Sequence, residues 1–153
     1  DELLAIRELV KDGKKKKAYK AFEKIRNLVV NNNVGNVLYG QLAYELKDYE
    51  TTIALLEPIP FHLLPPEEKE GGLTLLGYAY LTQAETWRNS YGSQKKQSRQ
   101  YYQKGYRILE DLLNNPDLDV IAKYNIENNI RQFKEHEKTM RFASPPAYIQ
   151  FVR

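Results

Sequence analysis

The chain has 153 residues, a net charge of +3 and no cysteine, so it suits one compact domain or one short repeat array without disulfides or cysteine-ligated metal sites. No apolar run approaches the roughly 18 residues that a membrane-spanning helix needs, and no hydrophobic signal segment opens the chain. The compartment stays open: the cytoplasm is favoured, but a membrane-tethered or exported parent is not excluded, because residue 1 is Asp and not Met.

Two helices are expected in the first thirty residues. Spaced apolar residues predict the first over about residues 2–11, and Asp12-Gly13 ends it because glycine is favoured just past a helix. The second is expected over about residues 15–30, with Ala18, Phe22 and Ile25 facing inward. Its first turn carries the cations Lys14 to Lys17, which the helix dipole disfavours at an N-terminus.

The next segment predicts another helix pair, over about residues 34–46 and 49–57. Pro58 and Pro60 end the second of these helices, because proline removes an amide donor and clashes with the preceding turn. Residues 61–64 form an apolar connection. Pro65-Pro66, followed by two glutamates, then opens a new helix, since proline and acids favour a first turn.

Residues 71–84 contain the most informative pattern of the chain. Leu73, Leu76, Gly77 and Tyr80 fall at i, i+3, i+4 and i+7 and therefore share one helix face. A glycine in mid-helix costs about 1 kcal/mol relative to alanine, so Gly77 needs a packing reason. We expect a neighbouring helix to cross there too closely for a Cβ atom.

The spacing Leu73-x2-Leu76-Gly77-x2-Tyr80 resembles the first-helix signature of the tetratricopeptide repeat (TPR) family, with leucine in place of its tryptophan. Tyr39-Gly40-x2-Ala43 repeats part of it, and Ala18-x3-Phe22 matches the second-helix signature. Positions about 34 residues apart also correspond, as they do in this family: Gly13, Ala18, Phe22 and Ile25 with Lys47, Thr52, Leu56 and Ile59.

The resemblance implies an all-α fold: an α-α superhelix of about three TPR-like helical hairpins with a C-terminal capping helix. The repeat domain would span residues 1–138, with repeats over about 1–32, 33–66 and 67–117 and a terminal helix over 118–138. An insertion near residues 86–98 lengthens the third repeat, and we expect it to form a projecting helical hairpin in which Trp87 and Tyr91 meet Tyr101 or Tyr102; a disordered loop is the alternative. Residues 139–153 are expected to form an extended tail.

No catalytic constellation is present in the sequence. His62 and His136 lie in unrelated segments, and Glu135-His136-Glu137 lacks the second histidine that a helical zinc site needs. No glycine-rich phosphate loop follows a strand. We therefore expect no enzyme activity, no cofactor and no metal, with His136 on a solvated helix face.

The resemblance implies function as a scaffold that binds a partner peptide or protein segment in a concave groove lined by the first helices. The residues expected on that face are Arg7, Lys11, Val37, Gln41, Tyr44, Tyr78, Tyr124, Asn128 and Arg131. Each has an alternative role in helix packing or as plain solvated surface. The sequence leaves the identity of the partner and the oligomeric state open.

A second hypothesis comes from the hairpin over residues 87–107, which carries cations and no acid. The cations are Arg88, Lys95, Lys96, Arg99, Lys104 and Arg107, interleaved with Trp87 and several tyrosines. Such a mixture suits single-stranded nucleic acid, through phosphate contacts and base stacking, or an acidic protein surface. The alternative is that the tyrosines pack inside the hairpin and the lysines solvate it.

Overall fold

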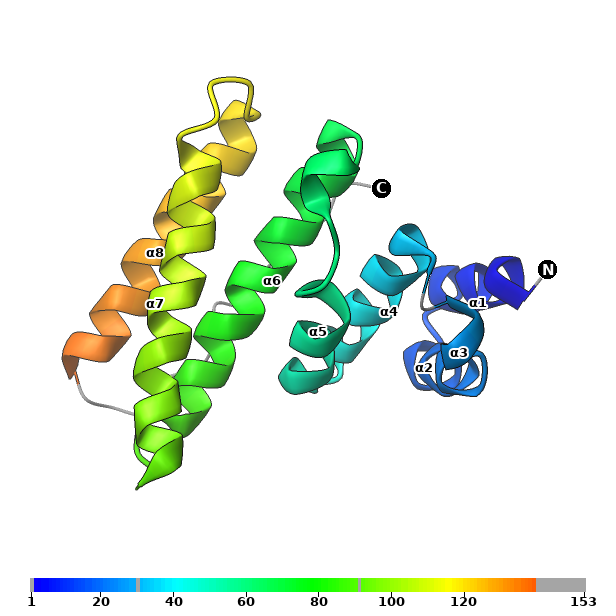
Figure 1. Ribbon diagram of the computed structural model, residues 1–153, viewed down its shortest axis with the longest axis horizontal. Helices are drawn as coiled ribbons and strands as arrows, with labels where there is room; N and C mark the ends of the chain where they lie inside the picture. The colour runs from blue at the N-terminus through cyan, green and yellow to red at the C-terminus, as the bar shows by residue number, and fades with distance from the viewer. Residues whose placement is uncertain (1, 30, 91, 140–153) are drawn as a thin grey trace. The chain divides into compact units, whose positions relative to one another are not determined.

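The computed structural model describes residues 2–29, 31–90 and 92–139, and all regular structure in these ranges is helical (Figure 1). This confirms the all-α fold class. The chain divides into two compact units, one ending at Ile59 and the other starting at Pro60. The boundary falls inside the expected second repeat.

The first unit contains α1 (Glu2–Lys11), α2 (Lys15–Lys24), α3 (Arg26–Val29), α4 (Asn33–Glu45) and α5 (Tyr49–Leu56). Helix α1 packs on α2, α2 on α4, and α4 on α5. The core gathers apolar side chains from the first three of these packing helices: Ile6, Ala18, Phe22, Tyr39 and Leu42. The rings of Phe22 and Tyr39 stack with centroids 5.0 Å apart, which ties α2 to α4.

The prediction of a single helix over residues 15–30 is wrong. The helix breaks at Ile25, whose amide donates to the carbonyl of Phe22. Helix α2 therefore ends at Lys24. A separate four-residue helix, α3, follows. No glycine or proline marks the break, so local sequence gave no sign of it.

The turns that follow α1 and α4 have the same backbone geometry 34 residues apart. Each is closed by two hydrogen bonds of 2.8–3.0 Å: Gly13 N to Val10 O and Lys14 N to Leu9 O in the first, and Lys47 N to Tyr44 O and Asp48 N to Ala43 O in the second. Gly13 and Lys47 both adopt left-handed backbone, with φ of +75° and +66°. This double closure is the Schellman motif. The correspondence inferred between Gly13 and Lys47 therefore holds in the backbone of unit 1.

Within the second pair, α4 and α5 approach closely at Gly40. A Cβ atom on Gly40 would lie 3.3 Å from Cγ of Leu56. The hydroxyl of Thr52, which is fully buried, donates to the Gly40 carbonyl at 2.8 Å. Side chains cap both helices: Asn32 accepts from Gly35 N at the start of α4, and Asp48 from Thr51 N at the start of α5.

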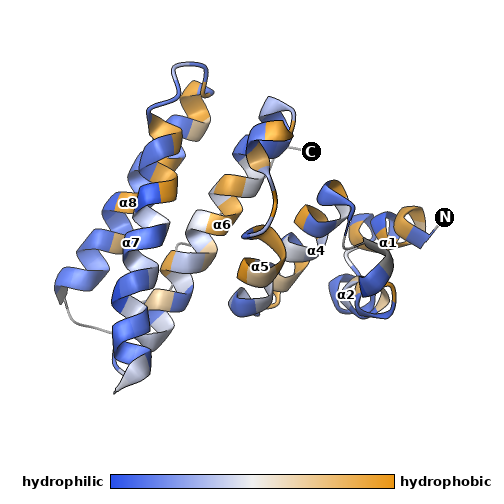
Figure 2. Cartoon of the chain, in the orientation of Figure 1, coloured by the Kyte–Doolittle hydropathy of each residue, from blue (hydrophilic) through white to orange (hydrophobic). Residues whose placement is uncertain are grey.

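The second unit contains a short 3₁₀ helix, η1 (Phe61–Leu63), and the long helices α6 (Pro66–Trp87), α7 (Ser93–Leu113) and α8 (Val120–Thr139). Helix α7 runs antiparallel to α6 along its length, and α8 packs on both (Figure 1). Helix α7 is mostly hydrophilic, whereas α6 is more apolar (Figure 2). This difference is expected, because α6 packs against α7, α8 and η1 and is buried almost all round over Leu75–Glu85.

Helices α6 and α7 cross at two glycines. A Cβ on Gly77 would lie 2.7 Å from Cγ and Cδ2 of Leu109, and a Cβ on Gly105 would lie 2.7 Å from Leu81 and 2.9 Å from the Gly77 carbonyl oxygen. The expected close crossing at Gly77 is therefore confirmed. Gly105 is its counterpart on α7, which the sequence pattern did not reveal.

The inserted residues 86–98 extend the helices as expected: α6 and α7 have 22 and 21 residues, against 13 and 8 for α4 and α5. A short turn joins them, with Gly92 at a φ of +67°. The remaining helix bounds fall within about three residues of those expected. The expected contact of Tyr91 lies outside the described residues, and so do residues 140–153 of the expected tail. Residue 139 is the last residue of α8.

Candidate functional site

A depression of about 330 Å³ lies between α1 and the start of α4 in the first unit. Its lining residues are Leu3, Leu4, Arg7, Asn32, Val34, Gly35 and Leu38. Leu4 and Val34 stay 57% and 43% exposed, which is unusual for apolar side chains that border a depression. Apolar surface beside an arginine can accept an apolar peptide side chain together with a carboxylate or a peptide carbonyl. Of the expected partner-binding face, Arg7 borders this depression.

The other expected partner-binding residues differ in exposure. Arg7, Lys11, Tyr124 and Arg131 are exposed, and Val37, Gln41, Tyr44 and Asn128 are half-buried. Tyr44 packs edge-on against Tyr49, with centroids 5.1 Å apart, so part of its surface serves the α4–α5 pair. Tyr124 belongs to an exposed apolar patch at the start of α8, where Val120 is 79%, Ile121 65% and Tyr124 67% exposed.

Tyr78 does not face a groove; it is only 2% exposed. Its hydroxyl accepts a hydrogen bond from Asn129 Nδ2 at 2.8 Å, and its ring stacks on Phe133 with centroids 6.5 Å apart. Burial raises the pKa of Tyr78 to about 12. The expectation failed because it treated the inner face of α6 as open, whereas α8 covers this part of it.

The hairpin formed by α6 and α7 keeps its aromatic side chains inside. The rings of Trp87 and Tyr101 lie 5.0 Å apart, as expected, and Tyr101 also packs edge-on against Tyr80 at 4.9 Å. Tyr102 is only 6% exposed. Tyr80 and Tyr102 are therefore enclosed, whereas Trp87 and Tyr101 pack on each other and stay half-buried.

The cations of the hairpin separate into two groups. One group is exposed along α7 and consists of Lys95, Lys96, Arg99, Lys104 and Arg107. Arg88 is half-buried and turns inward, where its guanidinium donates to the backbone carbonyl of His136. Arg88 therefore belongs to the packing of the bundle and not to the basic surface.

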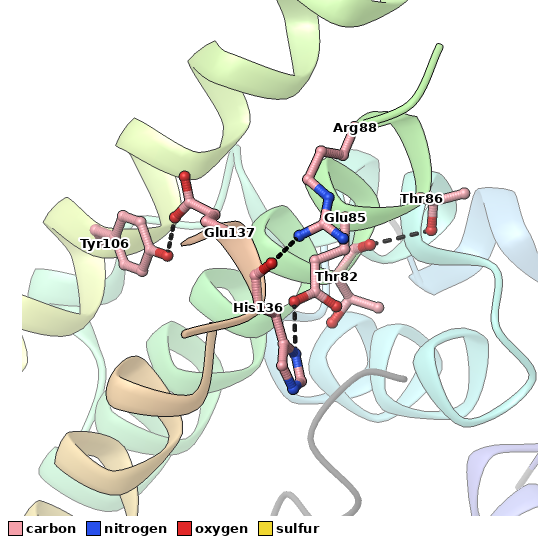
Figure 3. Close-up of polar contacts among 7 residues, drawn as sticks. All are labelled: Thr82, Glu85, Thr86, Arg88, Tyr106, His136 and Glu137. Atoms are coloured by element: carbon pink, nitrogen blue, oxygen red, sulfur yellow. Dashed lines mark hydrogen bonds and ion pairs between the residues drawn. The ribbon is translucent and has the colours of Figure 1, made fainter. Parts of the chain in front are cut away.

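A polar cluster, made of Glu85, Arg88, Tyr106, His136 and Glu137, joins the three long helices near the end of α6 (Figure 3). The Nδ1 atom of His136 lies 3.2 Å from Oε1 of Glu85, and the hydroxyl of Tyr106 donates to Glu137. His136 was expected on a solvated face. It lies instead against α6, with its side chain 30% exposed.

Glu85 is the most deeply buried carboxyl group of this polar cluster. It is 5% exposed, and burial raises its pKa to about 7, although the nearby His136 and Arg88 act in the opposite direction. Among the residues that the structure describes, no hydrogen-bond partner meets its Oε2 atom, the Nε atom of Arg88 or the hydroxyl of Tyr102, and all three atoms are buried. This buried carboxyl group contacts α8 through His136 and has little access to a substrate in solvent.

The sequence analysis missed this polar cluster, although one feature of the sequence was a sign of it. Glu85 continues the stripe Gly77–Leu81 by one more helical turn, so an acid lies on the apolar face of α6. Its partners Arg88 and His136 could not be inferred, because the contact depends on α8 folding back over α6.

Comparison of the chain with protein-family models, with curated proteins and with solved structures finds no match. Within the described residues, no three His, Asp or Glu side chains are grouped to hold a metal ion. No helix in those same ranges is both long and apolar enough to cross a membrane.

Proposed function

We propose that the chain is a non-catalytic interaction module of the tetratricopeptide type, which binds a segment of a partner protein on the first helices of its helix pairs. Two features of unit 1 support the repeat: successive helices pair, and the same Schellman turn recurs at the 34-residue spacing of this family. Helical repeats of this kind stack their pairs and use the resulting surface for binding.

The observation that carries the proposal is the depression between α1 and α4, the first helices of the first two pairs. Leu4 and Val34 offer apolar anchoring surface there, while Arg7 and Asn32 can bind a peptide backbone or a carboxylate. Leu3 and Leu38 pack into the core beneath, so the depression has a fixed floor.

An acidic partner bound along α7 is a second candidate. The five exposed cations of this helix support it, and no ion pair joins any of them to an acid within the described residues. Tyr102 is buried, and Trp87 and Tyr101 turn part of their ring surface toward each other, so less aromatic surface is left for base stacking; this favours an acidic protein surface over a single strand.

One capture experiment separates the two candidates. Tagged protein is used to capture partners from the source cell, and quantitative mass spectrometry compares wild type with two double variants, Leu4→Glu with Val34→Glu and Lys95→Glu with Lys96→Glu. All four side chains are exposed, so circular dichroism should show unchanged helicity. We expect partners to be lost from the first variant and kept by the second. If partners were lost only from the Lys95/Lys96 variant, binding at the depression between α1 and α4 would be refuted and the second candidate established.

A further inference from the structure

A cavity of about 530 Å³ lies in the second unit, lined by residues of η1, the start of α6, the end of α7 and the turn after it. Its apolar wall consists of Leu64, Leu73, Ile108 and Leu112. This volume falls within the range of binding pockets, and an apolar wall of this kind takes aliphatic side chains.

The wall of this cavity is held in place before any ligand arrives. Phe61 of η1 is 8% exposed and packs directly on Gly72, where a Cβ atom would lie 2.3 Å from Cε1 of its ring. At the end of α7, Asn115 orders the chain by accepting from the amides of Asp117 and Leu118. A site built from fixed elements loses little conformational freedom on binding.

Carboxylates dominate the rim. Glu70, Asp111 and Asp117 line the cavity, against one cation, Lys69. Burial, and then the charges of Asp119 and Asp117, raise the pKa of Glu70 above its ordinary value, although Lys69 acts in the opposite direction. The rim therefore carries more carboxyl groups than cations.

The carboxylates of the rim differ in what already occupies them. Asp119, beside the cavity, accepts hydrogen bonds from the amides of Ile121 and Ala122 and so caps α8. Asp111 and Asp117 are exposed, and no ion pair engages either of them in the described part of the chain. These two groups remain available to an arriving cation.

We infer that this cavity binds a basic segment of a partner protein, in which lysine or arginine alternates with leucine-like side chains. The apolar wall takes the leucine, and the carboxylates of Glu70, Asp111 and Asp117 meet the cations. This partner site belongs to unit 2 and does not depend on the depression between α1 and α4.

The probe is a fluorescein-labelled peptide, Leu-Arg-Leu-Lys-Leu between glycine spacers, whose binding is followed by fluorescence anisotropy. Two control peptides carry Glu in place of the cations, or Gly in place of the leucines. We expect both to bind at least tenfold more weakly than the probe, and probe binding to weaken as salt rises. Equal binding of all three peptides would overturn the inference.

Matched variants locate the site. Glu70→Gln with Asp117→Asn should weaken probe binding roughly tenfold, because two rim charges are lost. The control, Glu127→Gln with Glu135→Gln, removes the same charge from exposed positions of α8 and should leave binding unchanged. Amide chemical shifts should change around residues 62–73 and 108–117.

Several outcomes count against the site. Equal weakening by both double variants would show that only net charge matters. Shift changes elsewhere in the chain would place the peptide at another surface. If the probe fails to bind while a concentration-dependent dimer disappears in the Glu70/Asp117 variant, the occupant is a second copy of the chain, and the inference is wrong.

Discussion

Three glycine-to-alanine substitutions test the crossing of α6 and α7. Gly71 and Gly77 lie in the same helix, but among the described residues a Cβ built on Gly71 would meet no atom within 4 Å apart from its own stretch of helix backbone. Alanine at Gly71 should therefore add only its helix propensity and stabilise the protein by about 1 kcal/mol. It is the matched control for the two glycines at the crossing.

The crossing positions oppose this gain. A Cβ on Gly77 meets the branched end of the Leu109 side chain at 2.7 Å, whereas a Cβ on Gly105 also meets the Gly77 carbonyl oxygen at 2.9 Å. Overpacking costs about 1–3 kcal/mol, and a backbone atom cannot rotate away, so Gly105→Ala belongs at the upper end. Subtracting the propensity gain leaves Gly105→Ala destabilised by about 2 kcal/mol. Gly77→Ala should fall between this and Gly71→Ala, and Gly77→Val should be worse than Gly77→Ala.

Urea unfolding provides the assay. The chain has one tryptophan, Trp87, at the end of α6 and in contact with Tyr101 of α7, so its fluorescence reports this hairpin. Gly105→Ala should unfold at lower urea than wild type, and Gly71→Ala at higher urea. If alanine at Gly105 stabilised the protein as much as alanine at Gly71, the helices would not be in contact there, and the structural argument would be refuted.

Two further predictions concern ionisable groups. Because burial raises the pKa of Glu85 from 4.5 to about 7, its ionisation opposes folding: this loss of stability is absent below about pH 4.5 and complete above pH 7. Glu85→Gln should therefore gain on wild type by up to about 3 kcal/mol between those pH values, and a constant difference in urea midpoints from pH 5 to 8 would contradict this. Asp48 behaves oppositely. Burial raises its pKa, but hydrogen bonds from Thr51 and Tyr19 outweigh burial, so the pKa is lowered. The stability that ionised Asp48 contributes is therefore present at neutral pH and is lost as the pH falls below about 4. Asp48→Ala removes the cap of α5 and should cost about 2 kcal/mol at pH 7, measured by thermal unfolding; a loss equally large at pH 3 would argue against the ionised cap.

The sequence predicted those parts of the fold that depend on neighbouring residues. Spaced apolar side chains and helix-ending residues predicted the helix pairs, and a glycine on an apolar stripe predicted the crossing at Gly77. The break at Ile25 escaped because it carries no local marker. It is a main-chain rearrangement within a sequence that suits a continuous helix.

The candidate site was less predictable than the fold, because exposure depends on which helices meet. Tyr78 was wrongly placed on an open face, and Glu85 was missed. Both are covered by α8, whose first residue lies more than thirty positions away in the sequence. The cavity beside Glu70 likewise combines residues from η1, α6, α7 and the turn after α7. A pattern read along one helix contains no information on such a meeting point.

The two Schellman turns of the first unit have a consequence for its surface charge. Both are closed by main-chain atoms, so the side chains that follow them are free to differ: Lys14 to Lys17 begin α2, whereas Asp48 and Glu50 begin α5. One backbone shape thus presents a positive helix start in one copy and a negative start in the next. The copies attract each other where they touch, as in the Lys15–Glu45 ion pair at 3.2 Å and the bond from Tyr19 to Asp48. Reversing the charge of Lys15 alone would set an acid against Glu45 and turn this attraction into repulsion, whereas exchanging the charges of Lys15 and Glu45 together would keep it.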